Sequence, residues 1–156
     1  LGFGPTMIQH THGSTGICGI VYLHSDVWGS EWNDRILIGN PVNSRVNRDQ
    51  IHFVGSTPVA TEETDFIESS DPWFRPVDLT MGPDGALYIA DFYNRIIGHY
   101  EVPLDHPGRD RERGRIWRVV KTSGHVGKPT DPEIDPIDDP VLTLDSGDPF
   151  RQRAAA

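Results

Sequence analysis

Short segments in which apolar and polar residues alternate occupy most of the first 120 residues, and this period of two constrains the fold most. Successive side chains of a β-strand point to opposite faces of a sheet, so alternation of this kind is typical of strands. Apolar residues at helical spacing are hard to find. The sequence therefore predicts an all-β protein with eight strands, at residues 16–23, 34–40, 44–55, 64–69, 76–82, 86–92, 95–102 and 114–120.

The clearest turn is Gly82-Pro83-Asp84-Gly85, which has apolar residues on both sides. Proline presets φ at the second position of a turn, aspartate hydrogen-bonds locally, and glycine accepts a positive φ. These residues predict a β-hairpin between the fifth and sixth strands.

The eight strands form two groups of four, and each group is about 50 residues long, which is the size of a propeller blade. We therefore predict a partial β-propeller over residues 1–120, with antiparallel four-stranded blades at 10–70 and 71–120. An eight-stranded sandwich is the alternative architecture. Residues 121–156 are acidic and rich in proline, which predicts an irregular tail or linker.

Composition excludes several classes of protein. The net charge of −9 argues against binding to nucleic acid, and no apolar stretch is long enough to span a membrane. The single cysteine, Cys18, excludes an internal disulfide and a C-x-x-C-H haem attachment on this chain. The chain opens on Leu1 without a basic leader, so we expect it to be the interior of a longer protein.

A specific motif runs from Asp71 to Tyr93, with the sequence DPWFRPVDLTMGPDGALYIADFY. It resembles the blade motif of the PVC-type haem-binding or membrane-bound dehydrogenase propellers, which are similar to soluble quinoprotein glucose and sorbosone dehydrogenases. Residues 16–22 with 32–40 resemble the preceding blade of that family, and 108–111 with 114–119 resemble its last propeller strand. The resemblance covers about residues 10 to 120.

The resemblance implies that this chain forms the last two blades of a six-bladed propeller in a periplasmic or secreted parent protein. Such a parent would bind pyrroloquinoline quinone (PQQ), often with calcium, and oxidise a small sugar or polyol. Its partners would be the remaining blades and a cytochrome c domain. In the family an Arg-x-Arg pair grips the quinone; here Arg75 matches the first arginine and Val77 replaces the second. The lysine expected between residues 40 and 45 is also absent.

Arg75 is the predicted cofactor-binding residue, since a guanidinium binds carboxylates bidentately. The alternative is a structural arginine that pairs with Asp78 or Asp91 and ties the blades together. Asp78 and Asp91 are also predicted calcium ligands, because calcium prefers several oxygen ligands. Asp84 lies between them, but the turn alone accounts for it.

His10 and His12 lie two residues apart, a spacing found in some metal sites. A metal would need a third ligand, for which His24, His52 and His99 are only guesses, so we expect a solvated or channel-facing pair. If the chain joins a propeller, we predict that the two histidines contact substrate. Trp73 is predicted to stack on a sugar, with packing between blades as its alternative role.

Two other hypotheses stay open from sequence. The first is a non-catalytic propeller scaffold that binds glycan or protein, which the missing second arginine and lysine favour. The second is a truncated or separately folding fragment. Two isolated blades would leave strand edges exposed, so we expect the chain to associate on its own.

Overall fold

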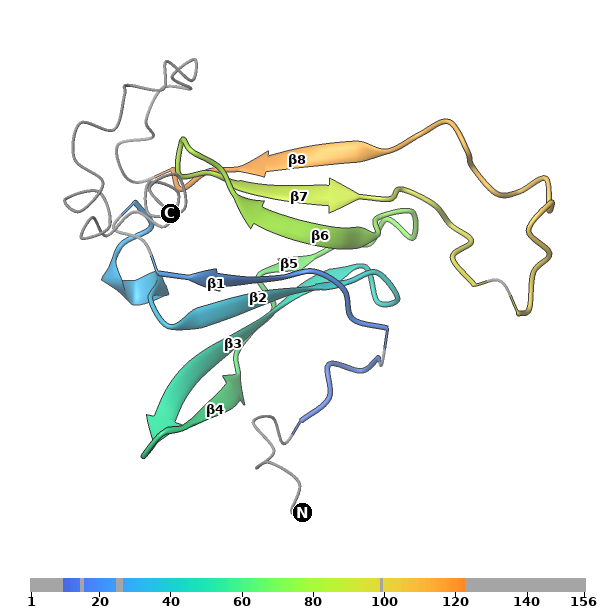
Figure 1. Ribbon diagram of the computed structural model, residues 1–156. Helices are drawn as coiled ribbons and strands as arrows, with labels where there is room; N and C mark the ends of the chain where they lie inside the picture. The colour runs from blue at the N-terminus through green and yellow to red at the C-terminus, as the bar shows by residue number, and fades with distance from the viewer. Residues whose placement is uncertain (1–9, 15, 25–26, 99, 123–156) are drawn as a thin grey trace.

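The computed structural model describes residues 10–14, 16–24, 27–98 and 100–122, which form two antiparallel β-sheets (Figure 1). Sheet A has five strands: β1 (Ile20–Leu23), β2 (Arg35–Asn40), β3 (Arg45–Val54), β4 (Thr57–Glu62) and β5 (Ile67–Glu68). Sheet B has three strands: β6 (Pro76–Met81), β7 (Leu87–Asp91) and β8 (Arg115–Val119). Within these residues the only helix is a short 3-10 turn at Ser30–Trp32, and no helix is long and apolar enough to cross a membrane. The all-β prediction is confirmed.

Sheet A has the order β1-β2-β3-β4, and β5 also pairs with β3. Strands β4 and β5 therefore border the same edge of β3, at Asp49–Val54 and at Arg45–Val46 respectively. The sequence did not predict β4, which contains Pro58. Proline is tolerated in an edge strand because its missing N–H can point away from the sheet.

In sheet B the predicted hairpin between β6 and β7 is confirmed. The amide of Gly85 donates to the carbonyl oxygen of Gly82 at 3.0 Å, which closes the turn. Gly85 has a φ of 74°, a backbone conformation that glycine adopts without steric cost. This left-handed residue lets the turn join two strands that keep their natural twist.

The predicted strand at 95–102 is wrong: the described residues of this segment form an irregular loop. The guanidinium of Arg109 donates to the carbonyl oxygens of Ile96, Gly98, Val102 and Pro103. These carbonyl groups are therefore satisfied by a side chain instead of a neighbouring strand. Sheet B consequently has three strands, and the prediction of two four-stranded sheets is replaced by sheets of five and three strands.

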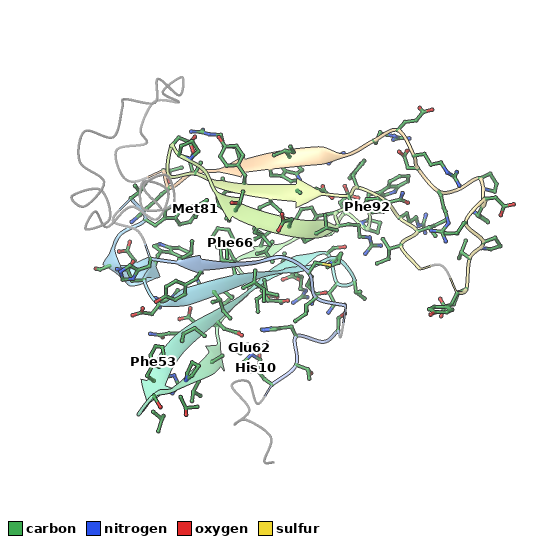
Figure 2. The ribbon with its side chains drawn as sticks, viewed as in Figure 1. His10, Phe53, Glu62, Phe66, Met81 and Phe92 are labelled. Atoms are coloured by element: carbon green, nitrogen blue, oxygen red, sulfur yellow. The ribbon has the colours of Figure 1, made fainter. Side chains whose placement is uncertain are left out.

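The two sheets pack together through β6, which lies against β1 and β2. The apolar core lies between the sheets and is formed by Val21, Leu23, Trp28, Leu37, Val46, Phe74, Leu79, Leu87 and Ile89. Figure 2 shows Phe66 and Met81 between the sheets, where both pack against this core. The outer strands β4 and β8 lie at opposite ends of the array (Figure 1). The sheets therefore meet at β1, β2 and β6, and their outer strands diverge.

Two glycines permit the close approach of the sheets. The amide of Gly19 donates to the carbonyl oxygen of Val77 at 3.1 Å, across the boundary between the sheets. A Cβ atom on Gly39 would lie 2.5 Å from the carbonyl oxygen of Pro76. Neither position has room for a side chain without movement of the β6 backbone.

The hairpin end of sheet B is joined to the loop before β2. The indole Nε1 of Trp28 donates to the carbonyl oxygen of Gly85 at 2.7 Å. Lys121 Nζ donates to the carbonyl oxygen of Trp28 at 2.7 Å and to Glu31 Oε1 at 2.5 Å. Most of the predicted tail at 121–156 lies outside the described residues.

The carboxylate of Asp84, in the β6–β7 hairpin, makes the stability of the fold decrease at acid pH. Burial acts to raise the pKa of Asp84, but hydrogen bonds from Arg118, the Ala86 amide and the Tyr88 hydroxyl outweigh it and lower that pKa below its ordinary value of 3.8. A lowered pKa in the folded state gives stability above the ordinary value that is lost as the pH falls. We expect the wild-type free energy of unfolding to fall more steeply below pH 4 than that of Asp84→Asn. Urea denaturation at a series of pH values measures this, and parallel pH profiles would contradict it.

Candidate functional site

His10, His12 and Asp49 form a compact cluster on the face of sheet A that points away from sheet B. Nε2 of His10 lies 3.1 Å from Oδ1 of Asp49, and Nε2 of His12 lies 3.2 Å from Oδ2 of the same carboxylate. The Asp49 side chain has 0% exposure and that of His12 has 2%, whereas that of His10 has 19%. Both imidazoles therefore converge through Nε2 on one buried carboxylate.

The pairing of the strands explains why Asp49 lies here. Asp49 of β3 is directly opposite Ile36 of β2 and Glu62 of β4. Residues opposite one another in an antiparallel pair share a face, so Glu62 lies on the same face as Asp49. Figure 2 shows His10 and Glu62 on this side of sheet A.

Two asparagine side chains hold the histidine segment in place. The Nδ2 atoms of Asn40 and Asn43 donate to the carbonyl oxygen of His12, at 3.1 Å and 2.9 Å. Asn40 also donates to Asn47 Oδ1 at 3.0 Å. Asn40 and Asn47 are buried, so these hydrogen bonds fix the backbone of His12 against the sheet.

A polar cavity of about 520 Å³ adjoins the cluster. Its lining includes Thr11, His12, Asn43, Asn47, Glu62 and Asp65. On its lining, Asp65 accepts hydrogen bonds from Arg45 and Asn47, both at 2.6 Å. Glu62 has a half-exposed side chain, and its Oε1 atom lies 3.5 Å from Nδ1 of His12.

Arg75 is buried at a separate place in the molecule, where sheet B meets sheet A. Its guanidinium donates to four main-chain carbonyl oxygens, and no carboxylate is among them. The acceptors are Asn94 at 2.9 Å, Pro41 at 2.5 Å, Val42 at 3.2 Å and Arg95 at 3.1 Å. Arg75 thus joins the β2–β3 turn to the segment that follows β7.

The environment of Arg75 is that of a structural residue. Burial lowers the pKa of its guanidinium, and the nearby carboxylates of Asp91 and Asp71 oppose this effect. Four of the five N–H groups of the side chain are engaged with the main chain. An anion bound in the bidentate manner would have to displace hydrogen bonds that connect the two sheets, so Arg75 does not fit a quinone clamp in this arrangement.

Asp78 and Asp91 are not brought together. Asp78 is opposite Ala90 on β7, whereas Asp91 is the next residue along that strand and therefore points to the other face. Oδ1 of Asp91 accepts from the amides of Arg75 and Tyr93, and Oδ2 accepts from Nε1 of Trp117. The geometry does not fit a calcium ion shared by these two carboxylates.

Comparison with known families assigns the chain to one of them. The model of a family described as Domain of unknown function (DUF7133) matches residues 3–123, which is more than half of the chain. The chain belongs to the DUF7133 family. Searches of the curated proteins and of the solved structures found no match.

In this DUF7133 domain Trp73 lies within a group of aromatic and arginine side chains. Its ring is 5.4 Å from that of Tyr93, and the guanidinium of Arg113 lies 5.4 Å from its ring centroid. Arg115 in turn lies over the Tyr93 ring. These contacts give Trp73 a packing role in the described structure, and sugar stacking at this residue stays a prediction.

The sequence predicted only part of the cluster of His10, His12 and Asp49 in this DUF7133 domain. The spacing of His10 and His12 is evident, but their partner Asp49 is 37 residues further along and becomes a neighbour only when β3 forms. Of the three ligands guessed from sequence, His24 and His52 are exposed and His99 lies outside the described residues. The available signal was the alternation of Asn47 and Asp49, two polar residues on one face of β3, both of which are buried.

Proposed function

We propose that this chain supplies two neighbouring blades to a dehydrogenase-like β-propeller. One observation carries the proposal: β1 and β6, the first strands of the two sheets, run in the same direction beside one another (Figure 1), and β6 packs against β1. The first strands of successive propeller blades lie around a shared axis in the same way, and blades are antiparallel sheets.

The parent protein, in this proposal, is an extracytoplasmic oxidoreductase that oxidises a small sugar or polyol and passes electrons to haem. The resemblance of residues 71–93 to quinoprotein propellers supports this part. Because Arg75, Asp78 and Asp91 do not fit a quinone and calcium site here, we assign this chain a structural role. PQQ and calcium would then be held by other blades of a periplasmic or secreted parent.

A non-catalytic propeller that binds glycan or protein is the second candidate. The observation that favours it is the commitment of the Arg75 guanidinium to four carbonyl oxygens. A scaffold needs this connection between sheets but needs no anion clamp. The two candidate functions differ in whether the parent protein takes up PQQ and oxidises a substrate.

The test is reconstitution of the parent protein with PQQ and calcium, followed by sugar-dependent dye reduction. We expect dye reduction with an aldose or polyol, and cofactor uptake by Arg75→Lys in proportion to the folded fraction. Glycan-array binding without cofactor uptake or dye reduction would replace the first candidate by the second. A folded Arg75→Lys protein that had lost cofactor uptake would contradict the structural role.

A further inference from the structure

We propose that His10, His12 and Asp49 bind a divalent first-row transition-metal ion of the zinc class. This site goes beyond the proposed propeller function, and it lies on the face of sheet A away from sheet B. Its three side chains each offer one ligand atom, and these atoms all lie within 4.8 Å of one another. Two imidazoles and one carboxylate are a common protein ligand set for such ions.

The distances suit a metal at the centre of the three atoms. The two imidazole nitrogens lie 3.1 Å and 3.2 Å from the Asp49 oxygens. Ligands about 2.1 Å from a tetrahedral zinc ion lie roughly 3.4 Å from one another, so these separations need only a small adjustment. The imidazole rings are nearly perpendicular, at 83°, and their centroids lie 4.8 Å apart.

A second observation concerns the other nitrogen of His12. Its Nδ1 is buried and has no hydrogen-bond partner within the described part of the chain, yet Oε1 of Glu62 lies 3.5 Å away. A histidine that binds a metal through one nitrogen usually donates its other N–H to a carboxylate or carbonyl, which fixes the ring. A small movement of the half-exposed Glu62 side chain would complete that arrangement.

Charge supplies a third argument. Asp49 has no exposed surface, and among the described residues both its oxygens contact only imidazole nitrogens. A buried carboxylate is costly unless a positive charge compensates it. A divalent ion would provide that charge, and the neighbouring Asn40, Asn43 and Asn47 amides would hold the ligand segment rigid.

The ligand types also select the class of ion. Calcium and magnesium prefer oxygen ligands, whereas imidazole favours zinc, copper, iron and nickel. Three protein ligands leave at least one coordination position for water or another exchangeable ligand. The polar cavity that adjoins His12 has Thr11 and Glu62 on its lining, but neither His10 nor Asp49.

The experiment is equilibrium dialysis of the full chain against Zn²⁺, with bound metal counted per chain by mass spectrometry. We expect one zinc per chain in the wild type. We expect at least about 100-fold weaker binding in His10→Gln, His12→Gln and Asp49→Asn, and about 10-fold weaker binding in Glu62→Gln. The matched control is His52→Gln, an exposed histidine on the same strand as Asp49, which should bind zinc like the wild type.

Two readouts separate loss of the metal from loss of the fold. Circular dichroism reports whether each variant folds, and His10→Gln should fold because His10 is partly exposed. Co²⁺ binding should give a visible absorption band in the wild type and His52→Gln that is absent from folded His10→Gln. Absence of zinc uptake by the wild type, or equal uptake by the wild type and folded His10→Gln, would overturn the proposal.

Discussion

Replacement of Arg75 by alanine is expected to lower the free energy of unfolding by about 4 kcal/mol. The substitution removes four hydrogen bonds and leaves the carbonyl groups of both sheets without their donors at a buried contact. An unsatisfied buried acceptor costs about 1–3 kcal/mol, although water entering the space offsets part of the loss. The measurement is the urea unfolding midpoint and slope of the full chain.

Two variants act as controls for Arg75. Arg75→Lys keeps the charge but has three donors on one nitrogen, so it cannot reach acceptors on both sides and should recover only part of the loss. Arg113→Ala removes an exposed arginine that contacts Asp110 and Trp73, and should cost under about 1 kcal/mol. A loss in Arg75→Ala no greater than that in Arg113→Ala would show that the Arg75 contacts do not stabilise the fold.

Replacement of Gly39 by alanine is expected to cost about 2–3 kcal/mol. The added Cβ would lie 2.5 Å from the Pro76 carbonyl oxygen and 3.1 Å from Cδ1 of Leu79, so β6 would have to move away from β2. Alanine has fewer accessible conformations than glycine in the unfolded chain, and this effect offsets the destabilisation by under about 1 kcal/mol. Urea denaturation measures the net effect.

Gly98→Ala is the matched control for this substitution. Among the described residues, a Cβ at Gly98 meets nothing within 4 Å, and the φ of Gly98 is not in the left-handed region. We therefore expect no loss of stability at this position. Equal stabilities of the Gly39 and Gly98 variants would mean that the sheets do not approach at Gly39.

Much of the strand pattern could be predicted because local signals and tertiary structure agree. The Gly82-Pro83-Asp84-Gly85 turn and the strands beside it follow from residues adjacent in sequence. The strand predictions fail where contacts between residues distant in sequence determine the local structure. Residues 95–102 alternate as a strand does, but their carbonyl groups bind the Arg109 side chain. Strand β4 contains Pro58, which weakens the strand signal although an edge position tolerates it.

The candidate site could be predicted only in part, for the same reason. His10 and His12 were evident from their spacing, whereas Asp49 and Glu62 required the register of β3 with β4. The predicted strand at 76–82 placed Arg75 correctly just before β6, but the sequence could not fix the direction of its guanidinium. That direction depends on the carbonyl groups of Pro41 and Val42, more than 30 residues earlier in the chain.

Amide hydrogen exchange at Gly19 tests the packing of the two sheets most directly. Gly19 N–H donates to Val77 of sheet B, so its protection depends on the neighbouring sheet instead of on its own. We predict slow exchange of this amide in the wild type, and a marked loss of protection in Gly39→Ala while the amides within β7 stay protected. Exchange of the wild-type Gly19 amide at the rate of an unstructured peptide would contradict the arrangement of β6 against β1 and β2.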